Sequence, residues 1–430
     1  MRNGERMRRR SFLRRNASAL VGLAAGPCIV PASALGLQES VAPSERIALA
    51  VIGMGARNRS NLPHFLAEKD VQCLAVCDCF ADRRSAGKQM VDGHYGTNDC
   101  VATRFQEDVL GRDDIDAVLI ATGDRWHSVL SILAAKAGKD VYCEKPFSLT
   151  IAEGRALVET TRRYGTVWQC GTQRRSNDSY RFVVEVVRGG MIGKLHTVTA
   201  ILGGWGGNGA ATAEPEPDPE VFDYDRWLGQ APWAPYSSVR VRYWRNHWDT
   251  GAGVTADMGA HYFDFAQWAR GSDMSGPVEF EGSAEWPDGG FSNVPFSVDA
   301  QARYEDGVRL LMKNGAKGVR FDGDGGWIHL TDGGEITAEP EAILRERSAP
   351  RVNWAFMGGH VRDFLDCIKS RKLTRAHPEI AHRSHTIAHC VNICLRLGRK
   401  LRWNPETERF VDDDQANRML CRAMRAPWQA

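Results

Sequence analysis

Charge of one sign is scarce in this chain of 430 residues. It holds 55 lysines and arginines against 53 aspartates and glutamates, a formal net charge of +2 at pH 7. The excess comes from the first 34 residues, which contain seven arginines and one acid; the rest has 48 basic and 52 acidic residues. A nearly balanced, slightly acidic body has no long-range field to attract nucleic acid or an anionic membrane. Neither is expected as a partner.

A long hydrophobic run is also missing near the N-terminus. The apolar segment 17–30 is interrupted by glycine and proline and is shorter than the ~20 residues of a membrane-spanning helix. It follows Arg9-Arg10 and precedes Ala32-Ser33-Ala34, a small-x-small cleavage site. This order is typical of a twin-arginine export signal over residues 1–34. It predicts a periplasmic protein with no stable membrane insertion after cleavage; a disordered basic tail is the alternative reading.

Metal-site spacing is absent as well. Cysteines 73, 77 and 79 cluster without a zinc pattern, and no carboxylate completes a familiar set with the histidines at 382, 385 and 389. We predict no metal, and we assign these histidines to helix packing. Of the eleven cysteines, Cys28 lies in the leader, and the other ten are expected to be buried or free thiols, because twin-arginine substrates fold in the reducing cytoplasm.

The composition is that of an ordinary globular protein. With 43% hydrophobic and 9% aromatic residues, the chain can bury a large core, which excludes wholesale disorder, collagen and a small disulfide scaffold. At ~150 residues per domain, the length suggests two or three domains. We divide the chain after its leader into two, residues 45–170 and 171–430.

The first of these domains opens with a nucleotide-binding pattern. Residues 47–52 form a continuous apolar run, as in a strand buried on both faces of a parallel sheet. The run leads into Gly53-Met54-Gly55-Ala56-Arg57, where two glycines allow a tight turn and close approach of backbone N–H groups to a pyrophosphate. Asn58 stands at the third glycine position of that motif. Pro63 predicts that the next helix begins a few residues late.

An acid at the end of the next strand indicates which dinucleotide binds. Residues 71–77 read as a buried strand that ends at Asp78, where a carboxylate can accept hydrogen bonds from ribose hydroxyls. This favours NAD. Arg83 and Arg84 follow and could meet a 2′-phosphate, so NADP stays possible.

Alternating strands and helices extend the pattern. Strands are predicted at 117–121, 140–143 and 167–171, with helices at 128–137 and 152–164 between them. This alternation predicts a doubly wound parallel sheet with its ligand at the carboxyl ends of the strands. Two motifs stand at those ends, Thr122-Gly123-Asp124-Arg125-Trp126-His127 and Glu144-Lys145-Pro146.

Beyond residue 171 the alternation fades. Strands predicted at 195–202, 298–304, 308–313 and 326–331 indicate an antiparallel sheet. The fold class is therefore α/β: a Rossmann-type doubly wound parallel sheet followed by an α+β domain with a large, mostly antiparallel sheet. The Pro/Glu-rich segment 211–220 reads as a surface loop or as a lid.

A polar stripe is predicted on one helix of the second domain. Residues 257–270 read as a largely buried helix with Thr255 as its N-cap. Three-to-four spacing places Asp257, His261, Asp264 and Trp268 on one stripe. Buried ionisable groups are costly unless they are paired or functional. Spacing alone leaves a structural His–Asp pair and a catalytic site as equal possibilities.

Three motifs carry a resemblance to a known family. They are the glycine turn, Glu144-Lys145-Pro146, and Gly251-Ala252-Gly253 leading into Asp257-Met258-Gly259-Ala260-His261. Together they resemble the Gfo/Idh/MocA family of sugar and polyol oxidoreductases, in its exported, twin-arginine-tagged branch. The sequence departs from the family pattern at Asn58, Gly123 and Arg125. The resemblance implies a nicotinamide cofactor and a C-terminal domain for substrate binding and oligomer contacts. It also implies a homo-oligomer, a dimer or a tetramer.

The same resemblance favours the catalytic reading of the stripe. Lys145 would hydrogen-bond the reacting oxygen, His261 would be the base, and Asp257 would orient one of them. Flat rings and polar side chains suit a carbohydrate, and of the tryptophans at 205, 227, 233, 244 and 248 one or two are expected to touch it. The expected substrate contacts are Arg174, Trp244 and His247. The expected cofactor contacts are Gly53, Met54, Gly55, Ala56, Arg57, Asp78, Thr122, Asp124, Trp126, His127, Glu144 and Lys145.

Three functions are compatible with these residues. The first is hydride transfer between a carbohydrate or polyol carbon and tightly bound NAD(P). The second is a redox-neutral NAD-dependent glycoside hydrolysis, which oxidises the sugar, eliminates the aglycone, adds water and returns the hydride. The third is a non-catalytic sugar-binding protein that keeps the fold as a scaffold.

Overall fold

The structure is a computed structural model that describes residues 41–204, 209–345 and 356–428. The predicted leader at 1–34 and Trp205 lie outside the described residues. The chain divides into two compact units, Met1–Arg46 and Ile47–Ala430. The first contributes one described element, the 3-10 helix η2 (Pro43–Glu45). Among the described helices none has the length and apolar character needed to cross a membrane. Everything below concerns the second unit.

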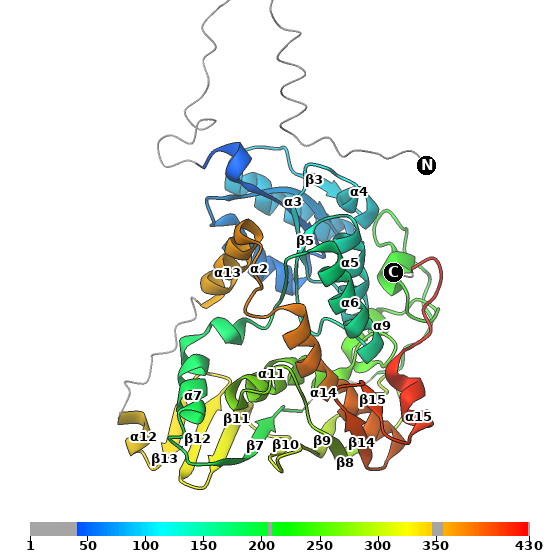
Figure 1. Cartoon of the computed structure of the whole chain (residues 1–430). Coiled ribbons are helices and arrows are strands. Elements are labelled where there is room, and N and C mark those ends of the chain that lie inside the picture. The colour runs from blue at the N-terminus through cyan, green and yellow to red at the C-terminus, as the bar shows by residue number, and fades with distance from the viewer. Residues whose placement is uncertain (1–40, 205–208, 346–355, 429–430) are drawn as a thin grey trace, which may run out of the picture. The chain divides into compact units, whose positions relative to one another are not determined.

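The first sheet of this unit is the predicted Rossmann-type sheet. Its strands pair in parallel in the order β3-β2-β1-β4-β5-β6, and the order reverses between β1 and β4. In open α/β sheets ligands bind at such a reversal, outside the carboxyl ends of the strands. Figure 1 labels β3 and β5 of this sheet. The strands are β1 (Ile47–Ile52), β2 (Val71–Cys77), β3 (Val101–Thr103), β4 (Ala117–Ile120), β5 (Asp140–Cys143) and β6 (Trp168–Cys170).

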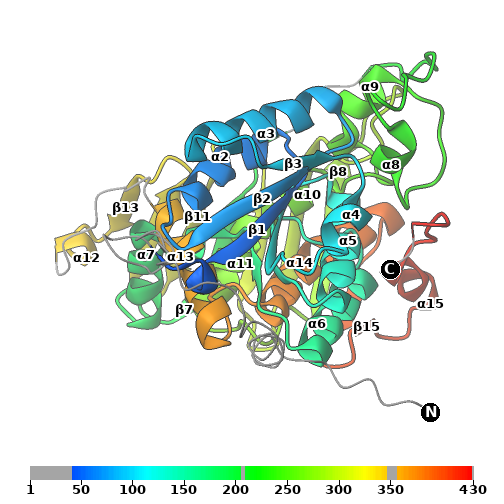
Figure 2. The same ribbon diagram turned by 90° about the horizontal axis from the view of Figure 1, so that it is seen from above.

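Helices cover both faces of this sheet, because β1 is apolar on both sides. Ala50 and Ile52 pack with α5 and α6, whereas Leu49 and Val51 pack with α2 and α3 on the other face (Figure 2). α13, from late in the chain, joins α2 there (Figure 1). The helices are α2 (Ala56–Leu66), α3 (Ala81–Tyr95), α4 (Gln106–Leu110), α5 (Asp124–Lys136), α6 (Ile151–Tyr164) and α13 (Phe356–Ser370).

The predicted late start of the helix after the glycine turn is wrong. α2 begins at Ala56 and holds Pro63 in its interior. An interior proline costs ~3 kcal/mol. Leu62 and Phe65 lie on either side of it and are fully buried against the sheet. Burying two such side chains contributes ~3–6 kcal/mol, which offsets the lost hydrogen bond.

The second sheet has nine strands within the described residues, in the order β13-β12-β11-β7-β10-β9-β8-β14-β15. The described pairings are antiparallel except that of β7 with β10, so the predicted mostly antiparallel sheet is confirmed. The strands are β7 (Leu195–Ile201), β8 (Glu279–Glu285), β9 (Ser297–Arg303), β10 (Arg309–Lys313), β11 (Gly318–Gly323), β12 (Gly326–Thr331), β13 (Ile336–Glu339), β14 (Leu401–Asn404) and β15 (Arg409–Phe410).

Three helices pack on one face of the second sheet and share its apolar core: α7 (Asp178–Arg188), α11 (Gly259–Arg270) and α14 (Pro378–Leu397) (Figure 1). Shorter elements connect the two sheets or extend the chain toward its end. They are η3 (Gln173–Ser176), α8 (Tyr224–Leu228), α9 (Ser238–Arg242), η4 (Trp244–Asn246), α10 (Gly253–Asp257), α12 (Ala342–Arg345), α15 (Asp414–Asn417) and η5 (Arg418–Leu420).

The helix predicted over 257–270 is two helices. α10 ends at Asp257 and α11 begins at Gly259, and Thr255 lies buried inside α10 rather than capping a helix. The N–H of His261 donates to the Met258 carbonyl. The carbonyl of Asp257 instead accepts from Lys145 Nζ at 3.1 Å. The break therefore supplies the site with a backbone acceptor.

Candidate active site

The glycine turn has the conformation that a pyrophosphate site needs. Gly53 adopts φ +89°, and a Cβ there would lie 2.6 Å from the Ala121 carbonyl oxygen, so no other residue fits. Gly55 caps α2 and has open space above its Cα, because a Cβ there would meet no atom within 4 Å. Free N–H groups at the start of α2 therefore face an open space, which suits an anion.

The departure at the third glycine position strengthens this turn. Asn58 is fully buried, and its Nδ2 donates to the Gly53 carbonyl at 2.6 Å. Where a glycine would let helix and strand pack closely, the amide ties the start of α2 to the turn. The substitution is thus compatible with a dinucleotide site.

Asp78 fixes the turn from the neighbouring strand. Its Oδ2 accepts from the Met54 N–H at 2.6 Å and its Oδ1 from the Phe80 N–H at 2.9 Å. Burial raises the pKa of Asp78, against the lowering effect of these two bonds. A carboxylate has about four acceptor positions, so lone pairs remain for ribose hydroxyls.

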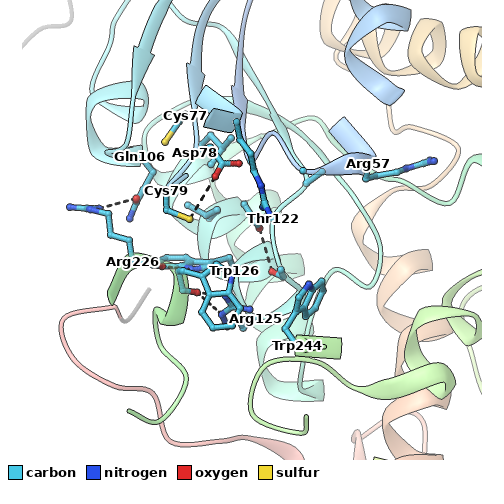
Figure 3. Close-up of a pocket in the computed structure, with 18 of the residues that line it drawn as sticks. Arg57, Cys77, Asp78, Cys79, Gln106, Thr122, Arg125, Trp126, Arg226 and Trp244 are labelled. Carbon is cyan, nitrogen blue, oxygen red and sulfur yellow. Dashed lines mark hydrogen bonds between the residues drawn. The ribbon is translucent and has the colours of Figure 1, made fainter. Parts of the chain in front are cut away.

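A cavity of about 310 Å³ opens at the turn (Figure 3). Its described lining includes seven arginines and one acid, Asp78. Such an excess of cations suits the two phosphates of a dinucleotide. Of the expected cofactor contacts, seven line the cavity: Gly53, Gly55, Ala56, Arg57, Asp78, Thr122 and Trp126. Met54, Asp124, His127, Glu144 and Lys145 do not line it.

Residues 220–228 border the cavity, which Arg226 and Trp227 line, and we call this segment the cover. The Phe222 ring stacks on that of Phe80, with centroids 3.8 Å apart. The Ala81 N–H donates to the Val221 carbonyl at 2.9 Å, immediately beyond Asp78. Glu220, the last residue of the predicted surface loop, forms an ion pair with Arg104 at 2.8 Å. The end of that loop thus belongs to the nucleotide site.

Two residues of the first domain hold the other end of the cover. Arg125 Nε donates to the Trp227 carbonyl at 2.8 Å, and Trp126 Nε1 donates to the Arg226 carbonyl at 2.9 Å. Figure 3 shows Arg125 and Trp126 side by side at the cavity. Arg125 carried no role in the sequence analysis; its guanidinium also lies over the Trp227 ring at 4.1 Å.

The C-terminal residues hold the cover from outside. Arg425 Nη1 bonds Asp225 Oδ1 at 2.6 Å, and its Nη2 donates to the Gly229 carbonyl at 2.9 Å. The Trp428 and Trp126 rings meet edge to face at 5.6 Å. A Cβ on Gly229, which adopts φ +58°, would lie 2.6 Å from the Trp126 ring. Three segments that are distant in the sequence therefore contact one another beside the cavity: the start of α5, the cover and the C-terminal residues.

Lys145 and Asp257 form the central ion pair of the site. Lys145 Nζ lies 2.7 Å from Asp257 Oδ1, and each side chain is 15% exposed. Arg245 Nε lies 3.8 Å from the same oxygen and also lines the cavity. Burial raises the pKa of Asp257, but the charges of Lys145 and Arg245 outweigh it and hold the pKa below its usual value. Asp257 is therefore ionised at neutral pH.

Glu144 anchors the segment of chain that carries Lys145. Its Oε1 accepts from Arg57 Nε at 2.9 Å, Asn61 Nδ2 at 2.8 Å and Gln173 Nε2 at 2.6 Å. Burial raises the pKa of Glu144, and Arg57 and these hydrogen bonds more than reverse the effect. Through these bonds the carboxylate of Glu144, the residue before Lys145, connects the end of β5 to α2 and η3.

His127 and Asp124 are both buried on α5. His127 Nδ1 bonds the Pro146 carbonyl at 2.6 Å, and burial lowers the pKa of its ring to about 4. Burial raises the pKa of Asp124 to about 7, although Arg245 acts in the opposite sense.

His261 lies in the first turn of α11, and the charge of Lys145 acts on its ring. Its ring is partly exposed, while Nδ1 is buried without a hydrogen-bond partner among the described residues. Asp264 is not its partner, because both Asp264 oxygens accept from Arg175, at 2.7 and 2.8 Å. The structural His–Asp pair is therefore not formed. A neutral ring with an accessible nitrogen can accept a proton.

We expect activity that depends on His261 as a base to persist in mildly acidic solution. Burial lowers the pKa of His261 well below its usual value, and the nearby Arg174, Lys145, Arg57 and His385 lower it further. The ring then stays neutral as the pH falls through the usual histidine range. The acidic limb of kcat/KM should lie well below pH ~6.5. A limb at or above that value would contradict His261 as the base.

The three expected substrate contacts, Arg174, Trp244 and His247, each pack against a different group of residues. Arg174 pairs with Asp332 and lies over the Tyr262 ring at 4.5 Å. Trp244 lines the cavity, and Arg245 stacks over its ring at 4.2 Å. The His247 ring stacks on that of Phe291, with centroids 4.7 Å apart.

The three histidines of α14 have ordinary partners. His382 bonds Glu408 at 2.8 Å, His385 bonds the Ala381 carbonyl at 2.7 Å, and His389 lies 3.3 Å from Ser148 Oγ. No group of three metal-ligating side chains occurs within the ranges that the structure covers.

Similar proteins place this geometry in a family. Residues 47–172 match the family model "Oxidoreductase family, NAD-binding Rossmann fold", and residues 181–430 match "Oxidoreductase family, C-terminal alpha/beta domain". Among curated proteins, myo-inositol 2-dehydrogenase of Thermotoga maritima is 26% identical over 226 residues, which is 53% of this chain and 55% of that protein. A glycosyl hydrolase family 109 protein of Solibacter usitatus is 30% identical over 169 residues, 36% of this chain and 37% of that protein.

The chain spans about half the length, or less, of these curated relatives. Among solved structures, aldose-aldose oxidoreductase from Caulobacter crescentus superimposes with a TM-score of 0.62 at 18% identity, over 83% of this chain and 99% of that one. The second family model alone matches more than half of the sequence, and the first marks the sheet with the glycine turn as an NAD-binding domain. The chain belongs to the Gfo/Idh/MocA family of oxidoreductases.

Proposed function

We propose that this protein transfers a hydride between a hydroxyl-bearing carbon of a carbohydrate or polyol and a tightly bound NAD. The proposal depends above all on Arg245, which lines the nucleotide cavity and also lies 3.8 Å from Asp257, the partner of Lys145. The ion pair and the cofactor cavity therefore adjoin. The names of the inositol and aldose relatives support the substrate class.

The side chains supply the proton and charge steps of this reaction. The glycine turn, Asp78 and the cavity arginines would hold NAD, which would supply the hydride acceptor. His261 takes the hydroxyl proton as a neutral base. Lys145 Nζ has three donors, of which Asp257 occupies two, so the third is left for the reacting oxygen. Asp257 holds the ammonium in place.

The other parts of the proposal concern assembly and location. We assign cofactor binding to residues 45–170, and substrate binding and subunit contacts in a dimer or tetramer to 171–430. Arg83, which lines the cavity near Asp78, keeps NADP possible. The order of twin arginines, apolar segment and cleavage site in residues 1–34 supports export to the periplasm.

A redox-neutral glycoside hydrolase is the second candidate. The cover favours it, because a retained cofactor that is reoxidised in every cycle needs no free NAD. The glycosyl hydrolase family 109 relatives support the same reading.

One incubation separates the candidates. The protein is purified without added nucleotide, its bound nucleotide is identified, and it is then given aryl glycosides and free sugars. For a dehydrogenase we expect oxidised sugar and reduced nicotinamide to appear in equal amounts; release of aglycone without net reduction would indicate hydrolysis. If Lys145→Ala and His261→Ala left every detectable turnover unchanged, the sugar-binding scaffold would gain at the expense of both catalytic candidates.

A further inference from the structure

Two free cysteines, Cys73 and Cys100, lie side by side at one edge of the first sheet. The edge strand β3 pairs in parallel with β2, and Val101 is the register partner of Ala75. Cys100 directly precedes Val101, so it lies one position further along its strand than Cys73. A strand spacing of ~4.8 Å and a rise of ~3.3 Å per residue place the two Cα atoms roughly 6 Å apart. This is the separation that a disulfide bridges.

Both thiols point to the same face of the sheet. The register of β2 against β1 skips Leu74, which interrupts the usual alternation of side chains along β2. Cys73 and Cys100 belong to one apolar core together with Val91 of α3, whereas Ala75 belongs to the core on the opposite face. The two sulfurs are therefore neighbours beneath α3.

The last turns of α3 fix the backbone of both cysteines. The Cys73 N–H donates to Tyr95 Oη at 3.0 Å, and the Cys100 N–H donates to Asp92 Oδ1 at 3.0 Å. The Cys100 carbonyl accepts from Lys88 Nζ at 2.7 Å. Because one helix holds both residues, a bond between their sulfurs needs little movement of the backbone.

The two thiols differ in acidity. The hydrogen bond from the Cys73 thiol lowers the pKa of Cys100, and Lys88 acts in the same sense, whereas burial and Asp92 act against them. The same contact between the thiols, together with burial, raises the pKa of Cys73 well above its usual value. Cys100 is therefore the first of the two to ionise, and the thiolate is the attacking species in disulfide exchange.

Cys100 also lies where the sheet opens most easily. It is 5% exposed and precedes β3, which has three residues and lies at the edge of the sheet. Val101 is 47% exposed. Short, exposed edge segments open locally at a lower free energy than central strands do. Such an opening admits a small oxidant to the Cys100 sulfur.

We propose that Cys73 and Cys100 are a modification site, at which they form a reversible disulfide by exchange with a small disulfide such as oxidised glutathione. The Cys100 thiolate attacks the small disulfide, which releases one thiol and leaves a mixed disulfide on Cys100. Cys73 then attacks the Cys100 sulfur and releases the second thiol. The two cysteines lose two protons and two electrons, and the small disulfide is reduced to two thiols.

The bridge would close a loop over residues 73–100, which includes Asp78 and Arg83 of the cavity lining. Because a cross-link restricts the unfolded chain, oxidation should raise the Tm by about 3–8 °C. The proposed export would bring the folded protein to a compartment in which disulfides persist. The disulfide itself does not depend on the proposed hydride transfer.

The test is a thiol map of the folded protein with its bound nucleotide. The protein is incubated with oxidised glutathione, the remaining thiols are alkylated, and the peptides are analysed by mass spectrometry without reduction. We expect the peptides of Cys73 and Cys100 to be linked, and dithiothreitol to separate them. Cys73→Ser should stop at a glutathione adduct on Cys100, Cys100→Ser should leave Cys73 as a thiol, and neither variant should show the rise in Tm.

Cys143 and Cys170 are the matched pair within the same protein. They are register partners on β5 and β6 and share a core on the other face of the sheet, but both are fully buried. The Cys143 thiol also donates to the Glu144 carbonyl at 3.5 Å. This pair should stay reduced.

The proposal is overturned if Cys73 and Cys100 are both recovered alkylated from the oxidised wild type, or if Cys143 and Cys170 are linked in their place. Both results come from the wild-type protein and require no turnover, so neither depends on whether a variant folds.

Discussion

Replacing Lys145 with alanine is expected to lower kcat by about 10²–10³-fold while NAD stays bound, the cost typical of removing one preorganised donor from an oxyanion site. Lys145 lies outside the cavity lining, so cofactor binding should not depend on it. Its third N–H is the donor left for the reacting oxygen, since the other two reach Asp257. Single-turnover formation of reduced nicotinamide measures the chemical step directly.

Two further variants give this prediction its controls. Lys136→Ala, at the exposed end of α5, removes a lysine far from the ion pair and should leave the rate unchanged. Asp257→Asn keeps the shape but removes the charge that holds Nζ, and should lower the rate in the same direction. A wild-type rate in Lys145→Ala, with nucleotide retained, would rule out this lysine as the oxyanion donor.

The first sheet could be read from the sequence because its strands carry a local signal. The run at 47–52 is apolar at every position because alternate residues, such as Leu49 and Ala50, enter the cores on opposite faces. The bounds of β2 and β5 agree with the predicted ranges for the same reason. Pro63 misled the prediction because the burial of its neighbours, which outweighs its cost, is a tertiary effect.

The candidate site likewise depends on contacts between residues far apart in the sequence, which local patterns do not predict. Lys145 and Asp257 are 112 residues apart, and only the resemblance to a family brought them together before the structure did. Arg125 looked like a departure from a motif, yet it bonds a carbonyl 102 residues away. The hydrophobic periodicity of a sequence does not predict such long-range contacts. The break at Met258, which leaves the Asp257 carbonyl to accept from Lys145, was likewise not predicted from the sequence.

Faster loss of the bound cofactor is the second large effect that we expect, because the cover borders the nucleotide cavity. We expect Arg125→Ala to release bound NAD about 30- to 1000-fold faster, so that the protein purifies largely without nucleotide. The variant leaves the buried carbonyls of Trp227 and Leu228, which accept from Arg125 Nε at 2.8 and 3.1 Å, without their charged donor. Each such loss costs ~1–3 kcal/mol, and ~1.4 kcal/mol is a tenfold change. The measurement is nucleotide content after gel filtration, with release followed under a chase of competing NAD.

Arg320→Ala separates this effect from the general cost of losing a stacked arginine. Arg320 lies 4.1 Å over the Trp327 ring, the same distance as Arg125 over Trp227, but in the second sheet away from the cavity. It should leave the release of NAD unchanged. Arg425→Ala loosens the cover from its outer side, where Asp225 is 54% exposed, and should speed release by a smaller factor without endangering the fold. Release as slow as in the wild type from both Arg125→Ala and Arg425→Ala would mean that the glycine turn and the cavity arginines hold NAD unaided.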